Sequence, residues 1–306
     1  MTALAGIGTH LPAGRVPIED LADRFGLTPM QMRVFRRYHK LGEVARGEGT
    51  LIDLLRAAVD ALEELPGNEQ RVKYVIHART FPVVVPFPLD PVRELCREKG
   101  LAHAVAFSVG HHACASGLLA VDLAGRLLAA DGDPSALALV LTGEKAFTRE
   151  TQLVPETSFF GEGAAACLVS ADGERDRLLA YAADLRGEFG EDTMEAEMEF
   201  QRVYNDSLAD AVLAAVERAG LTIADIDVIL PHNVNAVAWQ CVCRKLGFPL
   251  AGVVLDHVTA DGHVFCADAF LNHETARRRG LLTPGKRYVV AAAGGGATFS
   301  AMVFQH

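Results

Sequence analysis

Paired cysteines are the first feature that this 306-residue sequence lacks. Its six cysteines lie at positions 96, 114, 167, 241, 243 and 266, and none of them forms a CxxC pair. Structural zinc sites are usually built from such pairs, so the sequence predicts no metal centre. The cysteines are expected to be reduced thiols, as in most cytosolic proteins.

Long apolar runs and a leader are missing as well. No run approaches the roughly 20 apolar residues that cross a bilayer. Residues 1–6 have neither the basic start nor the long apolar stretch of a signal peptide. We therefore expect a cytoplasmic protein without a membrane partner.

The sequence has no long basic block either. Its 29 lysines and arginines are outnumbered by 39 acidic residues, for a formal net charge of -10. An acidic chain of this kind does not favour nucleic acid or an anionic membrane as a partner. Hydrophobic residues make up 50% of the chain, enough to bury a sizeable core. A small molecule or another protein is the expected partner.

Apolar runs alternate with stretches of helical periodicity, which is typical of strands buried beneath covering helices in an α/β protein. Gly220 and Gly280 stand where two of the helices should end. The expected strands cover residues 74–76, 105–109, 136–141, 228–230 and 288–291. The expected helices cover residues 51–65, 91–99, 115–130, 205–219, 236–246 and 268–279.

The two parts of the chain repeat each other weakly. Residues 110–116 parallel residues 262–268, and each segment opens an apolar helix that leads to a strand and a glycine-containing turn. Repeats of this kind indicate a duplicated architecture. We therefore predict two duplicated halves, residues 1–172 and residues 173–306, whose strand ends meet at the centre.

Cys114 is the strongest candidate for chemistry. It follows the expected strand at 105–109, which reads as a buried strand, and it precedes the helix expected at 115–130. At a helix N-terminus, free amides and the helix dipole favour a thiolate and can stabilise an oxyanion. The position predicts a nucleophile, and the group that activates it must come from elsewhere in the chain.

A histidine and a glycine run follow strands of the second half. His232 comes just after the strand at 228–230, where a general base or an oxyanion donor would stand. A structural histidine in a turn is the alternative. Gly295, within the run 294–296, offers a backbone amide that can approach a ligand closely.

Taken together and in this order, these segments resemble the β-ketoacyl-acyl-carrier-protein synthase III family of the thiolase superfamily. The resemblance implies a thiolase-like fold, in which two pseudo-duplicated α/β halves form a layered αβαβα core. It also implies an acyl-Cys114 intermediate made from a thioester, with the amides of Cys114 and Gly295 as oxyanion hole and His232 at the family's histidine position. The matching motifs lie at residues 7–12, 112–117, 160–166, 231–235 and 294–298.

Two further implications concern binding partners. Phe87 falls where the family inserts a phenylalanine into a partner subunit's acyl pocket, which implies a homodimer; local packing is the alternative.

The second implication concerns the donor. Met32 stands where the family has a tryptophan for coenzyme A, so the side chain on which adenine would stack is missing. Arg36 and Arg37 could still bind a phosphopantetheine phosphate or an acidic carrier protein, unless they belong to a solvated helix face. A carrier-protein thioester is favoured over coenzyme A as donor, with no permanently bound cofactor.

The sequence departs from the family at His263. The decarboxylating condensing enzymes have an asparagine there, whereas a histidine can remove a proton at neutral pH. With His232, it suits the deprotonation of an alcohol or amine. Asp268, five positions further on, could orient an imidazole as triad carboxylates do, or could cap the following helix.

These observations predict an acyltransferase that moves an acyl group from a carrier-protein or coenzyme A thioester, through acyl-Cys114, to a hydroxyl or amine in specialised metabolism. Two alternatives remain. The chain could be a decarboxylative ketoacyl synthase in which His263 replaces asparagine. It could also be a non-catalytic thiolase-fold partner subunit, although an intact Cys114 with two histidines argues against this.

Overall fold

The computed structural model describes all residues except 1, 87, 150 and 190–193. The strands are β1 (Ala3–His10), β2 (Gly14–Pro17), β3 (Glu43–Arg46), β4 (Val72–Ala78), β5 (Val105–Val109), β6 (Leu137–Glu144), β7 (Leu153–Val154), β8 (Ser158–Phe159), β9 (Gly163–Ser170), β10 (Arg177–Leu185), β11 (Val228–Leu230), β12 (Arg287–Gly294) and β13 (Thr298–Gln305). The α-helices are α1 (Ala22–Phe25), α2 (Pro29–Arg33), α3 (Leu51–Asp60), α4 (Pro91–Glu98), α5 (Ser116–Asp131), α6 (Met194–Arg218), α7 (Ala236–Leu246), α8 (Asp256–Ala260) and α9 (Asp268–Arg278).

One nine-stranded sheet runs through the molecule in the order β11-β12-β13-β10-β1-β9-β6-β4-β5. Its two parts have the same plan. In the first, β4 lies parallel to β6, which is antiparallel to β9, which is antiparallel to β1. In the second, β11, β12, β13 and β10 repeat those relations in that order. The pseudo-duplicated α/β fold predicted from the sequence is therefore confirmed.

The two halves meet where β1 pairs with β10, through Ala3 and Arg177. The predicted division at 172/173 falls between β9 and β10. As a domain boundary it stays a proposal.

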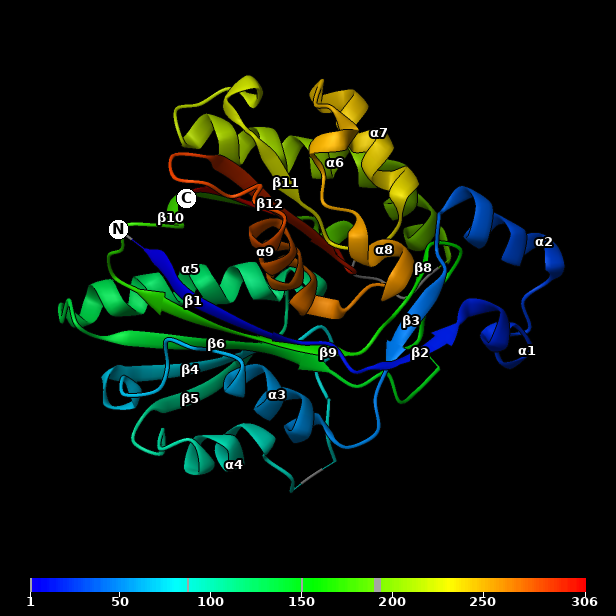
Figure 1. Ribbon diagram of the computed structural model, residues 1–306. Coiled ribbons are helices and arrows are strands. Elements are labelled where there is room, and N and C mark those ends of the chain that lie inside the picture. The colour runs from blue at the N-terminus through cyan, green and yellow to red at the C-terminus, as the bar shows by residue number, and fades with distance from the viewer. Residues whose placement is uncertain (1, 87, 150, 190–193) are drawn as a thin grey trace.

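Helices cover the sheet on both sides and fill the space between its two parts (Figure 1). Helices α3 and α4 pack on the outer face of the first half, and α6 and α7 on that of the second. Helices α5 and α9 lie in the middle. The strands suit this arrangement because successive side chains point to opposite faces: Leu139 joins the outer cluster, whereas Val140 joins the central one.

The central helix α5 corrects one expectation from the sequence. With the turn before it, the segment Ala113–Asp131 is long and apolar enough to cross a membrane by length and composition, although no such stretch was expected. Of the 18-residue apolar window within it, 56% is buried inside the protein. A helix between two layers of sheet buries more than one face, so it becomes apolar nearly all round.

Strand β5 corrects a second expectation. It spans the predicted residues, but Val105, Ala106 and Ser108 are exposed rather than buried. The reason is its place at the end of the strand order, where only β4 pairs with it. An apolar run predicts a strand, but its neighbours decide its burial.

Candidate active site

Cys114 lies in a strained turn at the start of the central helix. The turn Ala113–Ala115 precedes α5, and Ala113 has a φ of 45°, a backbone conformation that residues with a side chain rarely adopt. Phe265, before Cys266, has a φ of 49° at the matching place in the second half. Strain of this kind persists where the surrounding structure imposes it, often at functional sites. Here it places Cys114 at the edge of a cavity, 9% exposed.

The thiol belongs to a chain of three side chains. Nε2 of His263 lies 3.1 Å from Sγ of Cys114, and Nδ1 of His263 lies 2.5 Å from Oδ2 of Asp268. The imidazole can therefore exchange a proton with the sulfur while the carboxylate holds its other nitrogen. This is the geometry of an activated nucleophile with an oriented base.

Asp268 is the first residue of α9, and its carboxylate binds groups outside that helix. Oδ1 accepts hydrogen bonds from the Val264 amide at 2.7 Å and the Asn233 side chain at 3.0 Å. Oδ2 accepts from the Asn233 amide at 2.5 Å, in addition to its contact with His263. The carboxylate therefore fixes both histidine-bearing loops, and its placement matches the orienting role rather than capping alone.

The His263 ring is also held from its other face. Phe160 stacks on it with ring centroids 5.0 Å apart, and the His263 amide donates to the Phe159 carbonyl at 3.0 Å. Burial by itself would lower the pKa of His263, but the Asp268 carboxylate and the Cys114 sulfur outweigh it and raise that pKa to about 10. The site thus favours a charged imidazolium beside the sulfur of Cys114.

His232 is hydrogen-bonded to a residue that the sequence did not single out. Its Nε2 is hydrogen-bonded to the hydroxyl of Tyr204, on α6, rather than to Cys114. The His232 and His263 ring centroids are 5.8 Å apart. Burial and the neighbouring His263 lower the pKa of His232 to about 3, so it is neutral at neutral pH. It can offer a hydrogen bond to a substrate but is poorly suited to hold a proton.

Both histidines and the thiol face one cavity of about 450 Å³. Aromatic side chains from both halves form its walls, which suits an apolar acyl chain. Tyr204 lies on the upstream part of α6, which begins at Met194 rather than near residue 205 as predicted. The lining includes Thr80, Phe81, Cys114, Phe160, Phe189, Phe200, Tyr204, His232, His263 and Gly295.

The glycine turn between β12 and β13 approaches the Cys114 turn very closely. A Cβ on Gly294 would lie 2.1 Å from the His112 carbonyl oxygen, whereas one on Gly295 would meet nothing within 4 Å. Gly294 is therefore required for the approach, and Gly295 is free to face the cavity that it lines. The shared oxyanion hole of Cys114 and Gly295 stays a proposal.

Thr80 lies between two thiols. Its hydroxyl is 3.6 Å from the Cys114 sulfur and 3.5 Å from that of Cys266. Burial raises the pKa of Cys266 well above its usual range, and its thiol donates to the Ala113 carbonyl at 3.3 Å. Cys266 is therefore a protonated packing residue that supports the strained turn.

Thr80 is positioned by a buried carboxyl group that the sequence did not single out. Glu144 accepts hydrogen bonds from the amides of Thr80 and Phe81, at 2.5 and 3.1 Å. Burial raises the pKa of Glu144 to about 7, although both amides act in the opposite direction.

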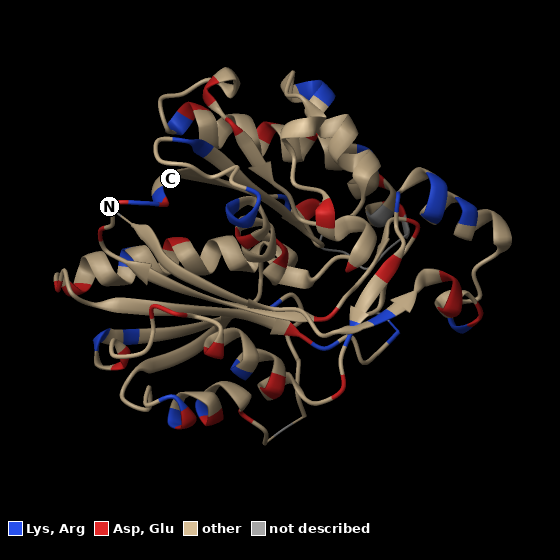
Figure 2. Ribbon diagram, viewed as in Figure 1, with Lys and Arg blue, Asp and Glu red and all other residues tan. Residues whose placement is uncertain are grey.

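The arginines expected to bind the donor lie outside the cavity lining. Arg36 and Arg37 are exposed on the turn that follows α2, and Arg36 is 3.5 Å from Glu19. Figure 2 shows the basic residues gathered there. Nδ1 of the neighbouring His39 contacts the carbonyl of Thr157, which lines the cavity, at 3.0 Å. The basic segment therefore adjoins the rim of the cavity.

Phe87, the residue predicted to enter a partner subunit's acyl pocket, lies outside the described residues.

Comparison with known proteins shows a family that part of the chain matches and solved structures that have the same fold. Residues 216–306 match the family model described as 3-oxoacyl-[acyl-carrier-protein (ACP)] synthase III C terminal. Over the whole chain, the solved structure of ChlB3, described as an acyltransferase, has a TM-score of 0.85 at 19% identity, covering 99% of this chain and 97% of that one.

Two further structures have the same fold. The 3-oxoacyl-[acyl-carrier-protein] synthase III of Aquifex aeolicus VF5 has a TM-score of 0.85 at 20% identity, with 100% of each chain covered. A variant of OleA from Xanthomonas campestris has a TM-score of 0.81 at 17% identity, covering 100% of this chain and 98% of that one. At these identities the structures establish the thiolase-like fold.

Proposed function

Because the chain is related to the 3-oxoacyl-acyl-carrier-protein synthase III family by its C-terminal match and by its fold, we propose that it is an acyltransferase. It would carry an acyl group from a thioester on Cys114 and transfer it to a hydroxyl or amine. The observation that carries this proposal is the chain from Cys114 through His263 to Asp268, at 3.1 and 2.5 Å.

In the first half-reaction, the Cys114 thiolate attacks the thioester carbonyl and a tetrahedral oxyanion forms. The amides of Cys114 and Gly295 would stabilise this charge. The carbon-sulfur bond to the donor then breaks, and the departing thiolate takes the proton from the His263 imidazolium. The products are acyl-Cys114, a free donor thiol and a neutral His263.

In the second half-reaction, an acceptor hydroxyl or amine attacks the acyl carbonyl while His263 removes its proton. Collapse of the tetrahedral intermediate expels the Cys114 thiolate and restores its ion pair with protonated His263. Asp268 stabilises the imidazolium each time it forms. Neutral His232, which is hydrogen-bonded to Tyr204, would orient the acceptor by a hydrogen bond.

The donor would be bound at the mouth of the cavity as a phosphopantetheine thioester. Arg33, Arg36, Arg37 and Lys40 form an exposed basic segment beside the rim. Tyr38, 60% exposed, adds an apolar surface to it. An acidic carrier-protein helix complements such a surface through charge and contact area, so we favour a carrier protein over free coenzyme A. Localisation in the cytoplasm and a role in specialised metabolism belong to the same proposal.

A homodimer is also part of the proposal. Strand β5 exposes a sheet edge, and its Val105 is 59% exposed. Unpaired edges invite pairing with a second strand. Light scattering after size exclusion should give a dimer for the wild type and a monomer for Val105→Lys, whereas Leu185→Lys, at a strand residue that is 64% exposed, should leave the dimer intact. A monomeric wild type would contradict this.

The decisive experiment is acylation. The protein is incubated with acetyl, medium-chain and malonyl thioesters on coenzyme A and on a carrier protein, followed by intact-protein mass spectrometry. A mass increase that Cys114→Ala abolishes is expected, and added alcohols or amines should discharge it. Release of carbon dioxide from the malonyl thioester with formation of a carbon-carbon bond would instead identify a condensing enzyme. Absence of acylation with every donor would leave a non-catalytic partner subunit.

A further inference from the structure

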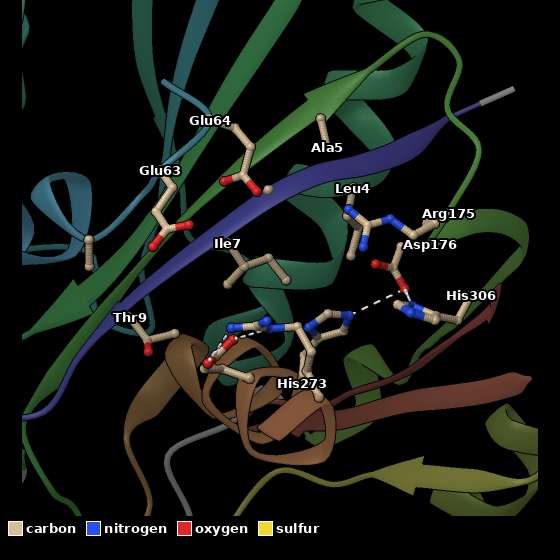
Figure 3. Close-up of a pocket in the computed structure, with 14 residues that line it drawn as sticks. Leu4, Ala5, Ile7, Thr9, Glu63, Glu64, Arg175, Asp176, His273 and His306 are labelled. Carbon is tan, nitrogen blue, oxygen red and sulfur yellow. Dashed lines mark hydrogen bonds and ion pairs between the residues drawn. The ribbon is translucent and has the colours of Figure 1, made fainter. Parts of the chain in front are cut away.

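A second cavity, of about 280 Å³, lies between the two halves and shares no lining residue with the cavity of Cys114. It is bordered by β1, by α9 and by the segment that leads into β10 (Figure 3). Three side chains with metal-binding atoms meet at its wall. They are Asp176, His273 and His306, and their nearest donor atoms all lie within 4.8 Å of one another.

The distances within this cluster are those of atoms that could share an ion. Nδ1 of His306 is 2.8 Å from Oδ1 of Asp176, and Nε2 of His273 is 3.3 Å from the same oxygen. In a tetrahedral zinc site, ligand atoms about 2.0–2.1 Å from the metal lie roughly 3.3 Å apart. Small rotations of the three side chains would therefore place all three donors around one ion.

His273 supplies an independent indication. The residue is 5% exposed, and neither ring nitrogen has a hydrogen-bond partner among the described residues. Its Nε2 points toward Asp176, as Figure 3 shows, but without the alignment of a hydrogen bond. A buried imidazole without such a partner is costly, and a metal ion would satisfy it.

The chemistry of the donor set also points to a particular class of ion. The set consists of the imidazoles of His273 and His306 and the carboxylate of Asp176. Tyr288 donates a hydrogen bond to its Oδ1 at 2.8 Å, an outer contact of the kind that orients ligating carboxylates. Two imidazoles and one carboxylate suit zinc and its neighbours rather than calcium or magnesium.

We propose that Asp176, His273 and His306 bind a divalent transition-metal ion of the zinc type, with the remaining coordination position open to the cavity. The ion would join the segment before β10, the middle of α9 and residue 306. It would therefore tie three separate segments of the second half together beside the Ala3–Arg177 strand pair. The same helix begins with Asp268, so the ion would also anchor the element that carries the orienting carboxylate.

The test uses the full chain after treatment with a chelator. Titration with Zn²⁺ by calorimetry should give one equivalent per chain, and the Tm should rise by at least about 3 °C at saturation. Co²⁺ should give a visible spectrum without the thiolate charge-transfer band that a cysteine ligand would produce. His273→Gln and His306→Gln should each weaken binding by about 10- to 100-fold.

Two controls separate this site from others. His257→Gln alters another buried histidine that contacts an aspartate, Asp261 at 2.6 Å, and should leave metal binding unchanged. Cys114→Ala should also leave it unchanged, because a metal held by Cys114, His263 and Asp268 would be lost in that variant. Failure of the wild type to bind Zn²⁺ or Co²⁺, a thiolate band, or loss of the ion in Cys114→Ala would each overturn the proposal.

Discussion

His263 differs from an asparagine because its ring can accept and release a proton. The ring contacts Cys114 at 3.1 Å and Asp268 at 2.5 Å, which is where the proposed reaction needs a proton to move. In that proposal, a residue from the second half of the chain acts on a residue of the first.

Replacing His263 by Asn should lower transfer to an alcohol acceptor by at least about 100-fold, because an amide cannot take the proton. Single-turnover assays on pre-acylated protein measure this step. His257→Asn is the matched control, since it removes another buried histidine near an aspartate but does not contact Cys114. Undiminished transfer in His263→Asn would contradict the assigned role.

The ion pair can be tested separately by alkylation of Cys114 with iodoacetamide. The pKa of His263 is raised to about 10, so this imidazole stays protonated from pH 6 to 9. With the proposed ion pair intact, the alkylation rate should vary little over that range. In His263→Asn the rate should rise about tenfold per pH unit, as for an ordinary thiol below its pKa. Equal pH profiles for both proteins would argue against the ion pair.

Among the elements, the turn between β12 and β13 depends most directly on one residue. Gly294→Ala should destabilise the protein by about 1–3 kcal/mol, because the added methyl group collides with the His112 carbonyl and pushes the turn away from Cys114. Urea unfolding measures the cost, and acylation of Cys114 should slow in parallel. Gly295→Ala, with open space around the new methyl group, should lose less than about 1 kcal/mol. Equal losses in both variants would refute the argument.

Elements with strong periodicity were predictable from the sequence. Helix α7 spans the expected residues 236–246, because Asn235 caps its start and Gly247 ends it. Helix α3 ends at Asp60, five residues before the expected end. Leu62 and Leu65 are buried beyond it, so tertiary packing rather than helical structure explains the apolar pattern there.

The residues of the candidate site could be predicted from the sequence better than the contacts between them. Cys114, His263 and Asp268 could be named because they lie at element ends with chemically distinctive side chains. The pairing of His232 with Tyr204 could not, since Tyr204 lies within a long helix and no motif marks it. Which histidine contacts the thiol depends on distances between segments far apart in sequence.

For the molecule as a whole, buried neutral histidines should determine its response to acid. Burial lowers the pKa of His77 to about 4 and that of His232 to about 3. Each is neutral when folded but takes up a proton near pH 6.5 when unfolded, so its contribution is present above that pH and is lost as pH falls toward the folded value. The free energy of unfolding should fall by up to about 1.4 kcal/mol per pH unit for each histidine. Glu144, whose pKa is raised to about 7, acts in the opposite direction and offsets about one histidine's share between pH 6.5 and 4.5.

Urea unfolding at pH 7.5, 5.5 and 4.5 measures this slope. His77→Gln should flatten it, whereas His103→Gln, at an exposed position, should not. A wild-type stability that stays constant from pH 6.5 to 4.5 would rule out this account.

The paired strained turns before Cys114 and Cys266 have a consequence for the origin of the site. Ala113 and Phe265 adopt nearly the same left-handed conformation at equivalent places in the two halves. Duplication of one half accounts for both turns, and a cysteine follows each of them. In the present chain one thiol faces a cavity and a histidine, and the other is sealed beneath it. The surroundings of the two cysteines, rather than the backbone turns before them, therefore distinguish the thiol that faces the cavity from the thiol that does not.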